Sequence, residues 1–295
     1  MLSILIPTYN YNVVPLVLEL QKQCLECDIN FEILVFDDNS KLCLDENEKI
    51  NSFENCRFEV LEKNIGRSAI RNLLAKKAKF ESLLFLDADT IPIQNHFIKN
   101  YISQVNEDEK IIYGGIEYQK EKPKKNQVLR WKYGNSREAL PVKKRQENPY
   151  LSFLTLNFLI HKNIFSTVSF NETIPNLRHE DTLFSYNLKQ KKIKITHIEN
   201  PVYHLGLDDF EDAIKKENES ILCLKYLIDH ELLPTDYVRL SKIASKIEKL
   251  NLNFAFAFFY RITQSIFLKN IASNNPSLLI FDLYRLVHLC NLNSK

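Results

Sequence analysis

The 295-residue chain contains only five glycines, and they form no phosphate-binding pattern. The turn Tyr9-Asn10-Tyr11-Asn12, after the first apolar run, has no glycine. A sugar nucleotidyltransferase would need a glycine-rich phosphate loop at that place. The pattern G-x-G-x-x-G is missing as well, which excludes a dehydrogenase that binds a dinucleotide. With 45% hydrophobic and 26% charged residues, the composition is that of an ordinary globular protein.

The chain also lacks a strong charge of either sign, an export signal and a membrane-spanning stretch. Its net charge of +2 is too small to indicate a nucleic-acid partner. The apolar start at residues 1–6 is too short for a signal peptide and has no basic residue before it. No stretch is long and uncharged enough to span a bilayer. We therefore expect a cytoplasmic protein that binds no nucleic acid, and peripheral contact with the inner face of the membrane stays open.

The six cysteines lack the second close pair that a zinc site requires. Cys24 and Cys27 form a lone C-x-x-C on an expected helix, whereas a redox motif of this kind would directly follow a strand. Cys43 and Cys56 are isolated. In a chain without an export signal, these residues are expected to be ordinary free thiols.

Strand and helix patterns alternate through the first ninety residues, which is typical of a doubly wound parallel sheet. In such a fold, ligands bind at the carboxyl ends of the strands, and polar residues gather there in this sequence. We expect strands at residues 2–6, 31–36, 57–61 and 82–87, and helices at residues 14–27 and 68–78.

The second half of the chain divides into a continued α/β pattern and a helical end. Further strands are expected at residues 110–118, 151–160 and 193–198, with a polar loop and a helix at residues 171–191. From residue 210 onward the pattern is helical. We therefore expect a catalytic domain over residues 1–208 and a helical region over residues 209–295.

Two segments of this half have more than one interpretation. The basic segment 120–145 guides an anionic acceptor, touches an acidic membrane surface, or is a solvated, mobile loop. The phenylalanine-rich segment 250–268 lies on a membrane, forms a homodimer face, or packs against the catalytic domain.

The tripeptide Asp87-Ala88-Asp89 ends the apolar run 82–86, which predicts a buried strand. Two carboxylates at this place suit a divalent cation that keeps its other positions for water and phosphate. A helix cap or a turn would explain the same residues. An EF-hand is excluded because the following residues lack the glycine that its loop requires.

Three further polar segments follow strands or open a helix. Residues 7–10 are suited to a nucleobase or form a strand-to-helix turn, and residues 37–40 accept hydrogen bonds from a uracil or a ribose or cap a helix. Residues 64–72 open a helix whose positive end favours an anion, or they form a surface helix with two exposed arginines. The candidate residues for binding a nucleotide are Pro7, Thr8, Tyr9, Asn10, Asp37, Asp38, Asn64, Gly66, Arg67, Arg71, Asp87 and Ala88.

These segments, in this order, resemble the family 2 glycosyltransferases, which use nucleotide sugars and have the GT-A fold. The resemblance covers roughly residues 1–207 and is carried by PTYN, FDDNS, NIGRSAIRN and DAD, with His179-Glu180-Asp181 and Tyr203-His204 further along. It implies an α/β fold with a mostly parallel mixed sheet flanked by helices. It also implies an inverting transfer from a nucleotide diphosphate sugar with a divalent metal, Mn²⁺ or Mg²⁺.

The resemblance assigns roles residue by residue. Thr8, Tyr9 and Asp38 match positions that hold the base and ribose, and Arg71 matches an arginine near the nucleotide, with Arg67 as its companion. Asp87 and Asp89 match the metal-diphosphate motif. Asp181 matches the catalytic base, and Glu180 holds the acceptor or shares that role. His204 matches a third metal ligand, or it is a structural histidine before Gly206.

The sequence departs from the family pattern at two places, and the second of them argues against a processive synthase. Asn39 stands where members often have glycine, and asparagine tolerates the left-handed backbone of such a turn. No QxxRW motif of the kind found in processive synthases follows Arg178-His179-Glu180-Asp181. We therefore expect transfer of one or a few sugars from a UDP-linked donor to a glycan or lipid-linked acceptor, in surface polysaccharide synthesis. The alternative is an inactive scaffold or partner subunit.

Overall fold

The computed structural model describes residues 1–105 and 110–294. The chain forms two compact units, each built from several segments. Unit 1 comprises Met1–Gln119, Glu138–Asn176 and Glu180–Gly206, and unit 2 comprises Lys120–Arg137, Leu177–His179 and Leu207–Lys295. The expected division into residues 1–208 and 209–295 stays a prediction.

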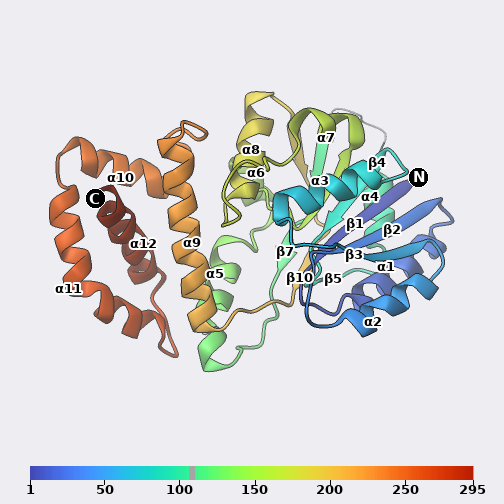
Figure 1. Ribbon diagram of the computed structural model, residues 1–295, viewed down its shortest axis with the longest axis horizontal. Helices are drawn as coiled ribbons and strands as arrows, with labels where there is room; N and C mark the ends of the chain where they lie inside the picture. Colours follow the sequence, from blue (N-terminus) through green and yellow to red (C-terminus); the bar gives the residue numbers. More distant parts are fainter. Residues whose placement is uncertain (106–109, 295) are drawn as a thin grey trace. The chain divides into compact units, whose positions relative to one another are not determined.

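Unit 1 contains a seven-stranded mixed sheet and a small three-stranded sheet (Figure 1). The strand orders are β3-β2-β1-β4-β8-β6-β9 and β5-β10-β7. The elements are β1 (Leu2–Thr8), α1 (Val14–Glu26), β2 (Phe31–Asp37), α2 (Leu44–Glu48), a 3₁₀ helix (Lys49–Ser52), β3 (Cys56–Val60), α3 (Arg67–Lys77), β4 (Ser82–Leu86), β5 (Thr90–Pro92), α4 (Phe97–Ile102), β6 (Lys110–Tyr113), β7 (Ile116–Glu117), α6 (Val142–Glu147), β8 (Asn157–His161), α7 (Lys162–Val168), α8 (Glu180–Gln190), β9 (Lys194–His197) and β10 (Val202–His204).

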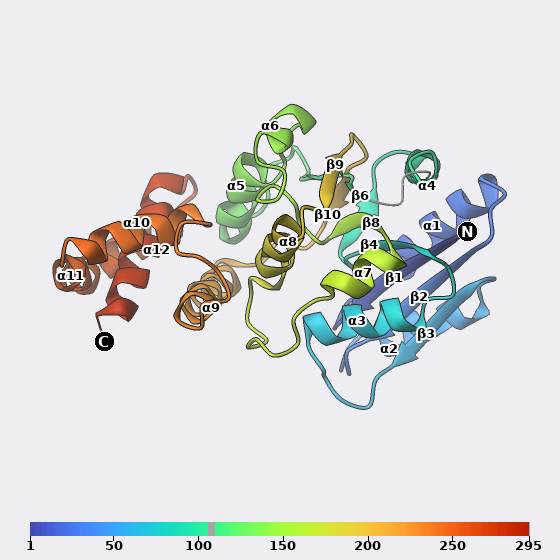
Figure 2. The ribbon, with the colours of Figure 1, turned by 90° about the horizontal axis from the view of Figure 1, so that it is seen from above.

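The large sheet is mostly parallel, with β8 as its antiparallel member. β1 pairs in parallel with β2 and β4, while β8 runs antiparallel to both β4 and β6. The central strands are nearly continuous apolar runs because helices cover both faces of the sheet. In Figures 1 and 2, α3 and α1 lie on opposite faces.

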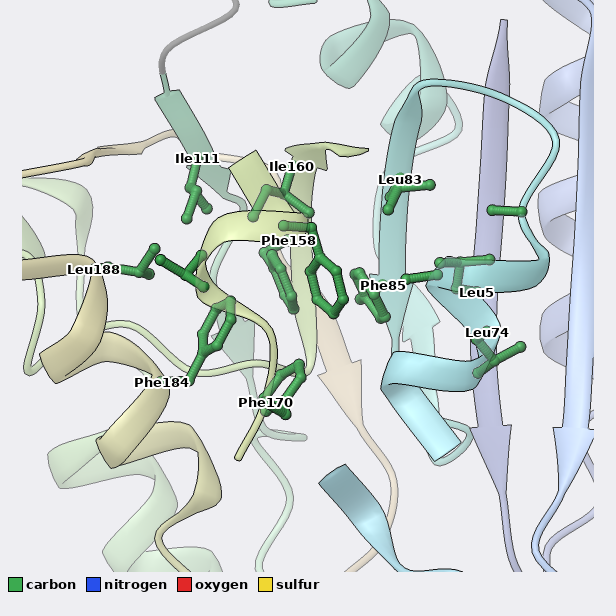
Figure 3. Close-up of a cluster of buried hydrophobic side chains, with 14 of the residues drawn as sticks. Leu5, Leu74, Leu83, Phe85, Ile111, Phe158, Ile160, Phe170, Phe184 and Leu188 are labelled. Carbon is green, nitrogen blue, oxygen red and sulfur yellow. The ribbon is translucent and has the colours of Figure 1, made fainter. Parts of the chain in front are cut away.

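An aromatic cluster fills the face of the sheet that is covered by α3, α7 and α8. Phe85 of β4 stacks on Phe158 of β8 with 4.9 Å between ring centroids. Phe170 stacks on Phe184 of α8 at 4.3 Å, and Figure 3 shows these rings facing one another. Offset aromatic pairs of this kind stabilise a core beyond their burial alone. The cluster therefore fixes α3 and α8, whose first residues belong to the candidate site, on the same face.

A buried amide network joins the large sheet to the small one. Asn157 begins β8 and is fully buried. Its Nδ2 donates to the carbonyls of Gly115 at 2.9 Å and Asn200 at 3.0 Å, and its Oδ1 accepts from Tyr101 Oη at 2.7 Å. Gly115 and Asn200 precede β7 and β10 by one and two residues. The network therefore sets the position of the small sheet.

Unit 2 is helical. One core cluster contains Leu129, Tyr260, Phe267, Ile271, Phe281, Tyr284 and Val287. The elements are a 3₁₀ helix (Lys125–Gln127), α5 (Val128–Arg137), α9 (Phe210–Asp229), α10 (Arg239–Lys249), α11 (Asn253–Ile271) and α12 (Leu278–Asn293). An ion pair between Arg285 and Glu217 at 2.5 Å links α12 to α9. Among the described residues, no helix has the length and apolar character to cross a membrane.

The expected fold class is confirmed, with three local differences from the sequence prediction. The strand expected at residues 110–118 is divided at Gly114 and Gly115, where Gly115 has a φ of 101°. The strand expected at residues 151–160 begins only at Asn157, because the apolar residues before it enter the core from a loop. The basic segment 120–145 contains α5 and part of α6, so its interpretation as a loop was wrong.

We expect Asn157→Ala to lower the free energy of unfolding by about 3 kcal/mol, because it removes three buried hydrogen bonds. Tyr101 Oη keeps only the carbonyl of residue 157 at 3.1 Å, and the Gly115 carbonyl keeps only the amide of Val202 at 3.4 Å. Urea denaturation of the full chain measures this loss. The matched control is Asn126→Ala at an exposed position, with an expected change within about 0.5 kcal/mol. Equal effects of the two substitutions would contradict the role of the network.

Candidate functional site at the carboxyl ends of the strands

The candidate site lies where β1, β2 and β4 end. Thr8 at the end of β1 pairs with Asp37 at the end of β2, and Asp87 directly follows β4. Parallel strands that end at one edge open a crevice there. The structure thus brings together the segments 7–10, 37–40 and 87–89 that the sequence selected.

The first two turns are held to each other by short polar contacts. The amide of Asn10 donates to Ser40 Oγ at 2.6 Å, and Asn10 Oδ1 accepts from the amide of Lys41 at 2.8 Å. Ser40 in turn donates to both oxygens of Asp37, at 2.7 and 2.6 Å. Asp37 is fully buried, whereas the Tyr9 side chain is 55% exposed. Asp37 therefore orders the turn, and Tyr9 is the group that this turn presents to solvent.

The carboxylate of Asp38 organises the entry into α3. It accepts from the amides of Ile65 at 2.7 Å and Gly66 at 3.0 Å, and Asn64 Nδ2 donates to the Asp38 carbonyl at 3.0 Å. Gly66 has a φ of 85°, and a Cβ there would lie 2.9 Å from the side chain of Asn176. The close approach and the left-handed backbone both require glycine at this position.

Arg71 is the buried cation of the site. Its guanidinium lies 2.7 Å from Asp87 Oδ1 and 3.6 Å from Glu180 Oε1, and it sits over the Phe170 ring at 5.4 Å. Burial lowers the pKa of Arg71, but the charges of Asp87 and Glu180 outweigh this and raise it. The alternative of two exposed arginines on a surface helix is therefore wrong for Arg71. Arg67 is more exposed and lies 4.0 Å from Glu180.

Glu180 and Asp181 form the first turn of α8, and their environments differ. Glu180 faces the two arginines, while Asp181 Oδ1 accepts from the amide of Thr182 at 2.6 Å. Burial, followed by the charge of Glu180, raises the pKa of Asp181 from 3.8 to about 6. A carboxyl poised near neutral pH is suited to proton transfer.

Asp89 and His204 lie together at the junction with the small sheet. His204 of β10 pairs with Thr90 of β5, and His204 Nε2 is 3.4 Å from Asp89 Oδ2. Two ligands at about 2.1 Å from one octahedral cation lie about 3 Å apart, so this pair fits a shared cation. The Asp87 carboxylate instead contacts Arg71. Within residues 1–105 and 110–294, no group of three or more His, Cys, Asp or Glu side chains is arranged to hold a metal ion.

Two neighbours of this pair were not selected from the sequence. A Cβ at residue 206 would collide with the Asp89 carboxylate, so Gly206 makes room for it. Burial, and after it the charge of Asp89, raises the pKa of Tyr11. In a chain with five glycines, a glycine two residues after the candidate histidine was a usable signal. Tyr11 carried no comparable one.

Comparison with known proteins supports a family assignment. A family model described as Glycosyl transferase family 2 matches residues 3–171. A chondroitin synthase from Pasteurella multocida (strain Pm70) is 22% identical over 218 residues, which are 72% of this chain and 22% of that protein. The chain thus spans about a fifth of the length of this curated relative.

Solved structures share the fold over nearly the whole chain. The crystal structure of S. aureus TarS 1-349 covers 100% of this chain and 92% of its own, at 18% identity and a TM-score of 0.51. The same TarS segment in complex with UDP-GlcNAc gives 17% identity, the same coverage and a TM-score of 0.53. The expected GT-A fold is confirmed by these matches.

The raised pKa of Asp181 predicts a pH-dependent stability. A carboxyl with a raised folded pKa contributes stability in full below its unfolded pKa and loses it as the pH rises through about 6. We therefore expect wild-type stability, relative to Asp181→Asn, to fall by about 1–2 kcal/mol between about pH 4 and pH 7. Urea denaturation of both proteins across this range tests it. A difference that does not change with pH would contradict the prediction.

Proposed function

The chain belongs to glycosyl transferase family 2, and on this premise we propose that it transfers a sugar, with inversion, from a UDP-linked donor to a glycan or lipid-linked saccharide acceptor. We further propose that it acts in surface polysaccharide synthesis. The link from Asp87 through Arg71 to Glu180 is the observation that carries the proposal. It ties the strand end that bears Asp89 to the helix that bears Asp181.

The donor side of the site is assigned to the turns after β1, β2 and β4. Thr8, Tyr9 and Asp38 are proposed to bind the base and ribose, and the exposed Tyr9 side chain is available to stack on the base. The TarS structure with UDP-GlcNAc and the similarity to a chondroitin synthase favour a UDP-sugar donor and a glycan acceptor.

Asp181 is proposed as the base. As the acceptor hydroxyl attacks C1 of the sugar, its O–H bond breaks and the proton moves to Asp181, while the bond from C1 to the diphosphate oxygen breaks. A single carboxylate suffices for such an in-line displacement, because the proton is taken on the face opposite the leaving group. Glu180 is held by Arg71 and Arg67, so it positions Asp181 and the acceptor.

Asp89 and His204 are proposed to hold the divalent cation, Mn²⁺ or Mg²⁺. Carboxylate and imidazole donors suit these ions, which commonly take their remaining ligands from substrate phosphates and water. The cation, when bound, neutralises the charge that develops on the diphosphate. Asp87 acts through Arg71 in this arrangement and keeps the guanidinium close to the strand end.

We expect Asp181→Asn to reduce transfer by a factor of about 10³ while UDP affinity changes by less than about threefold, because the base acts only on the acceptor proton. A screen of UDP-sugars, read as UDP release with a saccharide mixture, identifies the donor. Calorimetry with UDP then reports donor binding. Asp28→Asn, at an exposed carboxylate, is the matched control. Full transfer by the Asp181 variant would refute the base assignment.

A second prediction concerns the cation. We expect His204→Ala to weaken UDP binding about tenfold in the presence of Mn²⁺ and to leave it unchanged with a chelator, because only the metal-bound complex loses a ligand. His96→Ala, at an exposed histidine, serves as control. UDP binding that is the same with Mn²⁺ and with the chelator in the wild type would argue against the metal site. Absence of UDP binding under both conditions would favour an inactive scaffold.

A further inference from the structure

The longest apolar helix of unit 2 exposes large side chains. Phe254, Phe258, Phe259, Ile262 and Ile266 of α11 are between 45% and 81% exposed. We call these five residues the α11 face. The surfaces of soluble proteins carry scattered exposed apolar residues, but a contiguous group of this size indicates an interaction site.

The α11 face is one side of an amphipathic helix. At 100° per residue, its five members fall within an arc of about 140°. The opposite side of the helix carries Tyr260, Phe267 and Ile271, which are buried in the core of unit 2. Since the core takes the opposite side, the α11 face is left for a partner outside this unit.

The charged residues of α10 and α11 are nearly all basic. α11 contains Arg261 and Lys269 and no acidic residue. Residues 239–271, which include α10, contain six basic residues and one acid, Glu248. The basic residues are Arg239, Lys242, Lys246, Lys249, Arg261 and Lys269.

Two lysines, one before α5 and one within it, contact the segment that follows α11. Lys122 Nζ donates to the carbonyl of Asn274 at 2.9 Å, and Lys132 Nζ donates to Asn275 Oδ1 and the carbonyl of Pro276, both at 2.8 Å. These acceptors form the connection between α11 and α12. The basic segment 120–145 therefore contacts the connection that follows α11.

A second copy of this chain suits the α11 face less well than an anionic surface does. A twofold pairing of α11 with itself would bring Arg261 and Lys269 close to the same cations of the other copy, with no acid on either helix to pair with them. An acidic lipid surface supplies negative charge to the cations and an apolar layer to the phenylalanines. Helices with apolar aromatic residues on one side and basic residues around them bind in this interface.

We propose that the α11 face binds the surface of an anionic lipid bilayer, with α11 lying in the plane of the interface and the surrounding lysines and arginines contacting lipid phosphates. This interaction is independent of the glycosyl transfer. It needs no nucleotide, metal or acceptor, so its test and the tests of the proposed function can fail separately.

Vesicle sedimentation with the full chain tests the proposal. We expect binding to vesicles in which phosphatidylglycerol replaces a third of the phosphatidylcholine, and at most weak binding to pure phosphatidylcholine. Phe258→Ser with Ile262→Ser should reduce the affinity for the mixed vesicles at least tenfold. Arg261→Gln with Lys269→Gln should reduce it about thirtyfold, or about fivefold per charge.

The matched control is Leu18→Ser with Leu25→Ser, which removes two comparably exposed apolar residues from α1 of unit 1. Its vesicle binding and its UDP release should equal those of the wild type. Circular dichroism checks that each variant is folded, and the charge variant keeps the test decisive if the apolar one unfolds. Three outcomes would overturn the proposal: no wild-type binding to mixed vesicles, undiminished binding by both variants, or a wild-type dimer that the apolar variant dissociates while vesicle binding is unchanged.

Discussion

The buried guanidinium of Arg71 is the interaction on which the site depends. Removing a charged group from water costs several kcal/mol unless partners compensate it, and Asp87 and Glu180 compensate it here. One partner follows β4 and the other opens α8, so two distant parts of the chain meet at one cation. Because either carboxylate could leave only by stranding a buried charge, the arrangement is rigid. Asp181, the residue after Glu180, is therefore held at a fixed place relative to the strand end.

Arg71 holds the start of α8 in place through an ion pair with Glu180, and the uncharged Asn157 network holds the small sheet in place through hydrogen bonds. Asn157 donates two hydrogen bonds to the segments that lead into β7 and β10, and β10 carries His204 to the side of Asp89. The antiparallel strand β8 is what brings Asn157 opposite Leu86, next to the strand end. The one antiparallel insertion into the parallel sheet is thus what places the histidine. The proposed base is therefore positioned by the charged Arg71 cluster, and the proposed metal ligand His204 is positioned by the neutral Asn157 network.

The strand ends could be predicted from the sequence because their signals are local: an apolar run followed by Asp37 or Asp87. The burial of Arg71 could not, since Glu180 and Phe170, which contact its guanidinium, lie about a hundred positions away along the chain. The helix α5 was missed for a related reason. Basic residues are frequent throughout the segment 120–145 that contains it, whereas the buried side of α5 is only Val128, Leu129 and Gly134. Hydrophobic periodicity identifies a helix or strand when the apolar residues along it form a regular pattern. It fails for an element such as α5, in which only a few residues contact the core.

At two positions, Asp181 and Phe258, a different residue would stabilise the fold more, and this argues that both residues are functional. A carboxyl whose pKa is raised to about 6 is unfavourable in its charged form, and the amide of asparagine would fit the same hydrogen bond from Thr182. Likewise, Phe258 at an exposed position contributes little to the fold, and a polar residue would be better solvated. Neither residue is explained by folding. The carboxylate of Asp181 is explained by its proposed role as the base that accepts the acceptor proton. The exposed ring of Phe258 is explained by the proposed contact with the apolar layer of a bilayer.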